Sequence, residues 1–113
     1  MAHEGWVGVL SIEIHLPCAA SLKDKRSEVR RIKAGVARRW SVSISEVGQH
    51  DKWQRAQLAV ALASPDLEGA NAVLGSINDW FCGDPEIEVI AAGSWVAPSS
   101  GADGVDTIQR SVG

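Results

Sequence analysis

The amino-acid sequence predicts an α+β fold whose six elements follow one another in the order β-α-β-β-α-β. Apolar residues alternate with polar ones in four segments, which is typical of strands, and recur at spacings of three and four in two others, which is typical of helices. Residues that cap helices or form turns separate these segments. With 113 residues, 45% of them hydrophobic, the chain can form one domain around a single core.

The first two elements are a strand over residues 6–16 and a helix that begins near Leu22. Alternate positions of the strand are apolar, and Pro17 ends it because proline cannot donate a hydrogen bond to a neighbouring strand. Ser21, with Asp24 three residues later, resembles a capping box and marks the start of the helix. At about 100° per residue, the apolar positions of the helix fall within an arc of roughly 80°. These positions are Leu22, Val29, Ile32, Val36 and Trp40.

The next two strands are expected over residues 41–47 and 53–63, with turn-forming residues at 48–52 between them. The segment Ser-Pro-Asp at 64–66 provides an N-cap, a proline at the first helical position and an acidic residue in the first turn. A second helix therefore starts here, with the serine as its N-cap. Gly83 ends it, and its apolar face is formed by Leu67, Ala70, Val73, Leu74, Ile77, Trp80 and Phe81.

A last strand over residues 87–96 completes the series. Right-handed crossovers then place the first and third strands at the centre of a four-stranded antiparallel sheet, with both helices on one face. This arrangement is the ferredoxin-like βαββαβ sandwich. We expect residues 1–97 to form this domain and residues 98–113, which are rich in Gly, Ser and Asp, to be a flexible tail.

Charge is distributed unevenly along the chain, although the net charge is only −3. Residues 23–39 hold eight basic and two acidic side chains, a local charge of +6, whereas the rest of the chain carries −9. With the positive end of the helix dipole nearby, a basic helix face of this kind suits successive phosphates. We expect the anion-binding or RNA-binding residues to be Lys23, Lys25, Arg26, Arg30, Arg31, Lys33 and Arg38. The alternatives are a solvated surface whose charges pair with acidic residues elsewhere, or a contact with an acidic protein.

The sheet face away from the helices is a second surface of interest. RNA-recognition modules on this fold stack bases on aromatic residues of the two central strands. Here the expected residues of that face offer no stacking platform; they are Val7, Val9, Ser11, Glu13, His15, Arg55, Gln57, Ala59 and Ala61. Base-specific readout is therefore not expected there. Because the face is too apolar to remain bare, we expect that it could form a homodimer.

Polar residues around the turn form a third candidate, a hairpin polar cluster of Glu46, His50, Asp51, Trp53 and Arg55. Their spacing matches no known pattern of metal ligands or catalytic residues, so we expect no metal, no cofactor and no catalysis. We expect Glu46, Asp51 and Arg55 to fix the hairpin through charge-assisted hydrogen bonds.

Four further tryptophans have structural explanations. Trp40 and Trp80 lie on the apolar stripes of the two helices and are expected at the edge of the core. Trp6 and Trp95 lie near the ends of adjacent strands and are expected to pair across them.

A cytoplasmic location is expected for the chain. Its longest apolar run, at 58–63, is far shorter than the ~20 residues of a membrane span, and the first residues lack the pattern of a secretory signal. Cys18 and Cys82 show no C-x-x-C spacing, so we interpret them as isolated thiols.

Four motifs occur in a specific order: VGVLSIEIHLP at 7–17, SLKDKR at 21–26, EVG at 46–48 and WQRA at 53–56. With these motifs the chain resembles the YlxP-like family, small bacterial proteins classed as a domain of unknown function, over roughly residues 5–96. The resemblance implies the ferredoxin-like fold. Family members are often encoded among genes for translation initiation and ribosome maturation, which implies by association work on RNA or the ribosome.

Taken together, these patterns favour a small non-enzymatic protein that binds RNA or a ribosomal particle through its basic first helix. The alternative is a dimeric protein-interaction module whose basic helix binds an acidic protein partner.

Overall fold

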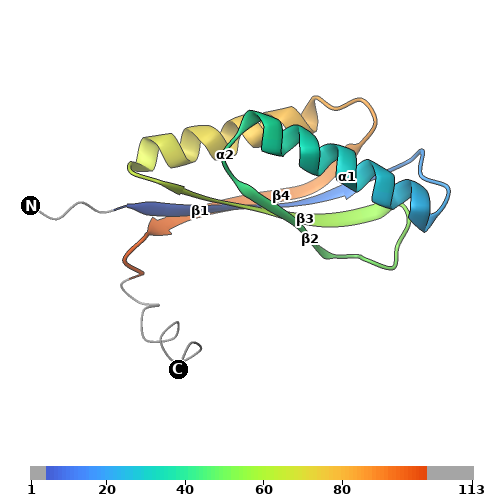
Figure 1. Ribbon diagram of the computed structural model, residues 1–113, viewed down its shortest axis with the longest axis horizontal. Coiled ribbons are helices and arrows are strands. Elements are labelled where there is room, and N and C mark those ends of the chain that lie inside the picture. Colours follow the sequence, from blue (N-terminus) through green and yellow to red (C-terminus); the bar gives the residue numbers. More distant parts are fainter. Residues whose placement is uncertain (1–4, 102–113) are drawn as a thin grey trace, which may run out of the picture.

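The computed structural model describes residues 5–101, which form a ferredoxin-like α+β sandwich (Figure 1). Its elements are β1 (Trp6–His15), α1 (Leu22–Arg39), β2 (Ser43–Gly48), β3 (Arg55–Ser64), α2 (Leu67–Cys82) and β4 (Glu88–Pro98). The four strands are antiparallel in the order β2-β3-β1-β4, so β1 and β3 are central as predicted. Both helices cover one face of the sheet, as Figure 1 shows.

The core lies between this face and the helices because the alternation of the strands directs every second side chain toward α1 and α2. The central strands supply Leu10, Ile12, Ile14, Ala56, Leu58, Val60 and Leu62, all of which are buried. The helices complete the core with Val29, Ile32, Val36, Ala70, Leu74, Ile77 and Phe81. The predicted apolar faces of the strands and helices are therefore confirmed, apart from Leu67, which is 41% exposed, and Leu22, which is half-buried outside the core cluster.

The predicted start of α1 is also confirmed. The Ser21 side chain accepts a hydrogen bond from the Asp24 backbone N–H at 3.1 Å, and the Asp24 carboxylate accepts one from the Ala20 N–H at 3.0 Å. The first bond satisfies a donor that the first turn of the helix would otherwise leave unpaired, and the second fixes the chain just before the N-cap.

The predicted cap of α2 is wrong by two residues. Asp66 is the N-cap and accepts a hydrogen bond from the Gly69 N–H, so α2 begins at Leu67, after the proline. Ser64 cannot cap this helix because it is the last residue of β3, where it pairs with Trp6 of β1. Its hydroxyl instead donates to the Asp66 carbonyl at 2.8 Å. The predicted end of the helix at Gly83 is confirmed.

Two tryptophans and one glycine define the contact between the helices. The rings of Trp40 and Trp80 meet edge to face with centroids 6.3 Å apart, and the Arg39 guanidinium lies over the Trp80 ring at 5.4 Å. Gly35 of α1 provides the space for this packing, because a Cβ atom there would lie 2.7 Å from Trp80 Cζ2. Trp40 and Trp80 thus lie at the edge of the core, as predicted.

The expected pairing of Trp6 with Trp95 is wrong. Trp6 of β1 is opposite Pro98 of β4, whereas Trp95 of β4 is opposite Val9 of β1. Trp6 and Val9 are an odd number of positions apart on β1, so their side chains point to opposite faces. The two rings therefore project from opposite faces of the sheet. Trp6 packs against the core, and Trp95 is 55% exposed on the face without helices.

The register of both edge strands shifts once. The shift between β1 and β4 leaves Ile90 as an extra residue, and the shift between β2 and β3 leaves Val47 as one. Both side chains are exposed. β4 extends to Pro98, two residues beyond the predicted end, and the remainder of the predicted tail from 102 onward lies outside the described residues. Neither described helix is long and apolar enough to span a membrane.

Candidate functional site

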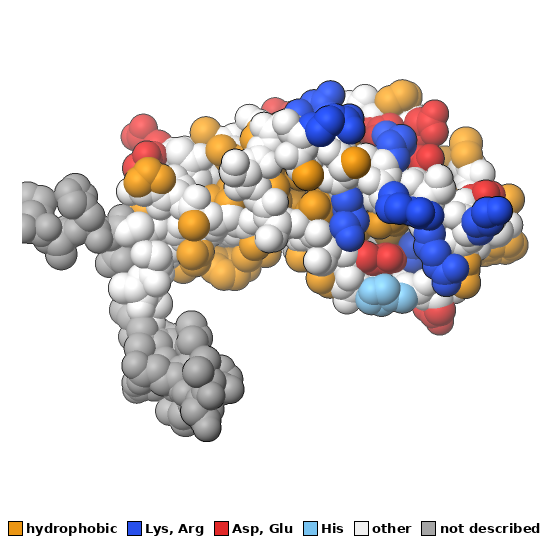
Figure 2. All heavy atoms as spheres, viewed as in Figure 1, with side chains coloured by type: hydrophobic (Ala, Val, Ile, Leu, Met, Phe, Trp, Pro, Cys, Tyr) orange, Lys and Arg blue, Asp and Glu red, His pale blue; other side chains and the backbone are white. Residues whose placement is uncertain are grey.

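Four cations follow one flank of α1 at spacings of three, four and three residues, and we call them the basic stripe: Lys23, Arg26, Arg30 and Lys33. At about 100° per residue, they fall within an arc of roughly 80° and extend over about 15 Å. The first three side chains are exposed and Lys33 is half-buried. Figure 2 shows Lys and Arg side chains gathered over the α1 half of the molecule.

The stripe is free of carboxylate partners among residues 5–101. Within the described part of the chain, the one side-chain hydrogen bond of the stripe is a long one of 3.4 Å from Arg30 Nε to the Arg26 carbonyl. The other side of α1, by contrast, faces α2, because Arg39 contacts Trp80 there. The stripe therefore lies on the flank of α1 away from α2.

Lys25 was expected among the anion-binding residues, and the structure corrects this expectation. Its side chain is 1% exposed, and its Nζ lies 2.7 Å from Glu46 Oε2 of β2 and donates a hydrogen bond to the Gln49 carbonyl. The physical reason is the helical period. Lys25 follows Lys23 by two residues, which is a rotation of about 200° around the helix axis, so its side chain points toward the sheet. Lys25 thus ties α1 to the β2–β3 hairpin and is not available to a ligand.

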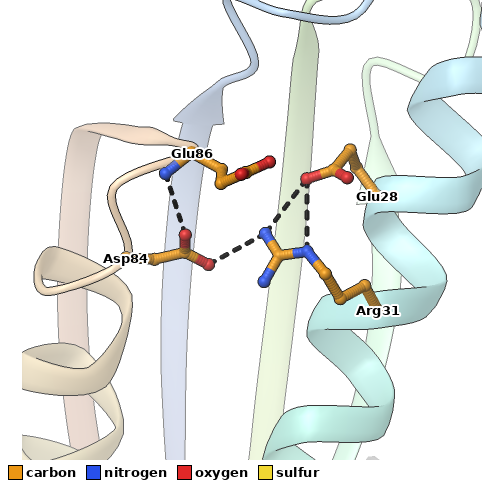
Figure 3. Close-up of polar contacts among 4 residues, drawn as sticks. All are labelled: Glu28, Arg31, Asp84 and Glu86. Carbon is orange, nitrogen blue, oxygen red and sulfur yellow. Dashed lines mark hydrogen bonds and ion pairs between the residues drawn. The ribbon is translucent and has the colours of Figure 1, made fainter.

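Arg31 is the second predicted cation that does not join the stripe. Figure 3 shows its guanidinium between Glu28 on the same helix and Asp84 in the loop after α2. Its Nη2 donates to Asp84 Oδ2 at 2.9 Å and to Glu28 Oε1 at 3.0 Å, and Asp84 in turn accepts a hydrogen bond from the Glu86 N–H. The arrangement uses the charge of Arg31 to hold the loop after α2 against α1.

Two opposing effects set the pKa of Arg31. Partial burial lowers this pKa, but the hydrogen bonds and the charges of Glu28 and Asp84 raise it, and the net result is a pKa above the ordinary value. Because the folded-state pKa is raised, the stabilisation from Arg31 is fully present at neutral pH and is lost only in strong alkali.

Arg38 remains exposed in the last turn of α1, about 60° around the helix from Lys23 and so beyond the edge of the stripe. A cation there also interacts favourably with the negative end of the helix dipole. Five of the seven predicted anion-binding residues are thus accessible and without a carboxylate partner among the described residues, and four of them form one continuous row.

The hairpin polar cluster does not come together as expected. Glu46 pairs with Lys25, and Arg55 Nη1 lies 3.3 Å from Glu13 Oε2 of β1. His50 Nε2 lies 3.2 Å from the Glu46 carbonyl, and Asp51 is exposed. Trp53 is 53% exposed, consistent with its expected place outside the core. Glu46 and Arg55 thus make charge-assisted contacts at the hairpin, as expected, but with Lys25 and Glu13 and not with each other, and no such contact of Asp51 is seen among the described residues.

Two residues that sequence reasoning missed, Gln49 and Gln54, also hold the hairpin. Gln49 adopts a positive φ of 64°, and the Lys25 side chain binds its carbonyl oxygen. Gln54 Nε2 donates to the Ala19 carbonyl at 3.0 Å, which links the hairpin to the loop before α1. No signal in the sequence indicates the role of Gln49. A glutamine is uncommon in the left-handed region, so its presence in the turn does not predict that conformation.

Two ion pairs lie at the charged end of the sheet. His15 Nδ1 lies 2.7 Å from Glu88 Oε1, so these two side chains form a pair beside the Arg55–Glu13 pair. A hollow of about 480 Å³ next to them is lined by His15, Asp51, Lys52, Trp53, Gln54 and Arg55. No three metal-ligating side chains come together within the described part of the chain.

Comparisons with known proteins place the chain in a family. The family described as "Protein of unknown function (DUF503)" matches residues 7–93. The uncharacterized protein YlxP of Bacillus subtilis (strain 168) is 34% identical over 82 residues, which are 73% of this chain and 89% of that protein.

Among solved structures, a hydantoinase/carbamoylase family amidase from Burkholderia ambifaria resembles this chain with a TM-score of 0.52 and 16% sequence identity. The likeness covers 87% of this chain but only 30% of the amidase chain, and at this identity it concerns the fold alone. The family match and the YlxP relative, by contrast, cover most of the sequence, and the chain therefore belongs to the DUF503 family of proteins of unknown function.

Proposed function

We propose that this chain is a cytoplasmic, non-enzymatic RNA-binding protein whose basic stripe binds the phosphate backbone. The observation that carries the proposal is the row of four accessible cations on one flank of α1, without carboxylate partners among residues 5–101. We expect the bound RNA to be ribosomal RNA.

The dimensions of the stripe fit a nucleic-acid strand. Its length of about 15 Å corresponds to roughly four phosphates at the ~3.4 Å rise of one duplex strand. Lys23 lies in the first turn of α1, where the positive end of the helix dipole adds to the attraction for an anion.

The surface of α1 favours a phosphate backbone over an acidic protein. The large exposed hydrophobic side chains of the described residues lie on β2, the hairpin, α2 and β4, and α1 carries none. The centre of a protein interface usually contains aromatic or aliphatic anchors, whereas a phosphate-binding surface needs only accessible cations.

The salt dependence of RNA binding tests this proposal. With a fluorescein-labelled single-stranded RNA, four phosphate contacts predict a slope of about −3 in a plot of log K against log salt concentration. Reversing two stripe charges with Arg26→Glu and Arg30→Glu should lower the affinity at least tenfold and flatten the slope by about 1.4, since two phosphate contacts are removed.

The control is a double variant with the same change in net charge away from the stripe, Arg39→Glu with Lys52→Glu. It should bind RNA nearly as the native protein does, provided that far-UV circular dichroism shows a native fold. Equal losses in both double variants would mean that net charge alone matters and would contradict a site on α1. If native protein captured from a lysate retained an acidic protein after nuclease treatment and no RNA before it, the acidic partner would replace RNA.

A further inference from the structure

The sheet face opposite the helices has a gradient of side-chain size across its strands. One row runs across the sheet from β2 to β4 through Ser43, Ala61, Val9 and Trp95, as the strand register shows. The two residues on the β2 and β3 side are small, and the residue on the β4 side is the largest of the twenty. Trp95 is 55% exposed, so a large apolar ring stands out from this side of the sheet.

The small residues leave a hollow beside this ring. An open depression of about 560 Å³ is lined by Val7, Gly8, Val9, Ser41, Val42, Ser43, Ala61, Leu62 and Ala63. Val7, Val9, Ser43, Ala61 and Ala63 occupy the strand positions that alternate with the core residues, so their side chains place the depression on the open face. Hydrophobic side chains also gather along the lower edge of the left half of Figure 2, below the helices. The open face thus carries the protruding Trp95 ring on β4 and a depression that begins on the neighbouring strand, β1.

We propose that a second copy of this chain covers the open face, with Trp95 of each copy seated in the depression of the other. A two-fold axis that lies between the sheets and runs along β1 exchanges the β4 side with the β3 and β2 side. It therefore places Trp95 over Ala61 and Ser43 of the second copy, at the same height along the strands. Such an interface is isologous, because each copy contributes both the ring and the depression.

Charges at the other end of the face agree with this symmetry. Arg55 of β3 and Glu88 of β4 lie on either side of His15 in one row across the sheet. The same axis brings Arg55 of each copy to the Glu88 side of the other, so opposite charges meet there. Glu13, close to the axis, is already paired with Arg55 of its own chain.

The size of the face is sufficient for a specific dimer. Three strands of ten or eleven residues and the six-residue β2, at about 3.4 Å per residue and 4.8 Å per strand, give roughly 600 Å² on each copy. The total of about 1,200 Å² lies at the lower end of the range of stable protein interfaces. Two sheets can pack through such faces at about 10 Å, as in β-sandwiches.

Sedimentation velocity of the full chain tests the proposal. The native protein should sediment as a dimer at micromolar concentration. Trp95→Ala should raise the dimer dissociation constant at least about thirtyfold, as expected for a buried aromatic anchor at an interface. Ala61→Glu should also give a monomer, because it places a charge in the depression. Both positions are exposed in the single chain, so neither change should disturb folding.

Leu67→Ala is the matched control, since Leu67 is a large apolar residue that is 41% exposed but lies at the start of α2, on the helical side of the sheet. This variant should remain dimeric. A native protein that stays monomeric at 100 micromolar would overturn the proposal and would assign the face to a different partner. A Trp95→Ala variant that stays as dimeric as the native chain would overturn the proposed seating of the ring.

Discussion

Lys25 shows how the surroundings of one residue decide its role. In the sequence it is one of eight cations between residues 23 and 39, yet its charge lies beneath α1 against Glu46. A charge taken out of water is unfavourable unless a partner and hydrogen bonds compensate, and Lys25 has both in Glu46 and the Gln49 carbonyl. It therefore fixes the distance between α1 and the hairpin.

Removal of this charge has a specific consequence for stability. Lys25→Met keeps much of the side-chain volume but leaves Glu46, which is 19% exposed, without its partner. We expect the free energy of unfolding to fall by about 3 kcal/mol, measured by urea denaturation. The double variant Lys25→Met with Glu46→Leu should recover most of this loss, because it removes both charges together. A double variant as unstable as the single one would show that the hydrogen bond to Gln49 matters more than the ion pair.

The same residue marks the limit of prediction at this scale. Its charge could be read from the sequence, and so could the spacing of the stripe, because both depend on local periodicity. The burial of Lys25 and the pairing of Arg31 with Asp84 depend on segments 21 and 53 residues away in the sequence. No periodic pattern carries that information, so the sequence could not show that Lys25 is buried or that the exposed Arg31 is already paired with carboxylates.

The ends of the helices were predicted correctly where they depend only on residues that are close together in the sequence. The capping box of α1 and the glycine at the end of α2 were correct because their hydrogen bonds lie within a few residues of one another. The cap of α2 was misplaced because Ser64 and Asp66 both have cap chemistry, and pairing with β1 decided between them. The extra residues Ile90 and Val47 depend on strand register, which a period of two does not reveal.

The contact between α1 and α2 depends on a glycine, and this leads to a paired prediction. Gly35→Ala should destabilise the protein by about 1–3 kcal/mol, because the new methyl group would lie 2.7 Å from the Trp80 ring. Gly75→Ala on α2, where no atom lies within 4 Å of the added Cβ, should instead stabilise it by up to about 1 kcal/mol.

Thermal or urea unfolding of the two variants separates packing from helix propensity. Both substitutions raise the intrinsic preference for helix equally, so the difference between them measures the cost of displacing Trp80. Near-ultraviolet circular dichroism should change only for Gly35→Ala. If both variants were equally stabilised, the close packing of Trp80 on Gly35 would not hold in solution.

At the scale of the whole molecule, the two proposed surfaces belong to different layers. The basic stripe lies on a helix, whereas Trp95 and its depression lie on the face of the sheet without helices. Face-to-face pairing of two sheets leaves both helical layers on the outside. A dimer of this kind would carry two basic stripes on opposite outer surfaces, and neither stripe would be covered by the interface.

This separation predicts that the two activities can be removed one at a time. Trp95→Ala should leave the affinity per chain for a short RNA, too short to reach two stripes, within about twofold of the native value. For an RNA long enough to contact both stripes of a dimer, the same variant should bind at least tenfold more weakly than the native protein. In the native dimer, binding to one stripe raises the effective concentration of the RNA at the second stripe, and the monomeric variant loses this gain. The stripe variant Arg26→Glu with Arg30→Glu should bind both RNAs weakly but sediment as the native protein does. Fluorescence anisotropy measures the affinity of each variant for the short and the long RNA, and sedimentation velocity measures whether each variant is a dimer. A loss of short-RNA binding in Trp95→Ala as large as in the stripe variant would show that the open face itself contacts RNA, and the division of roles between the two layers would then be incorrect.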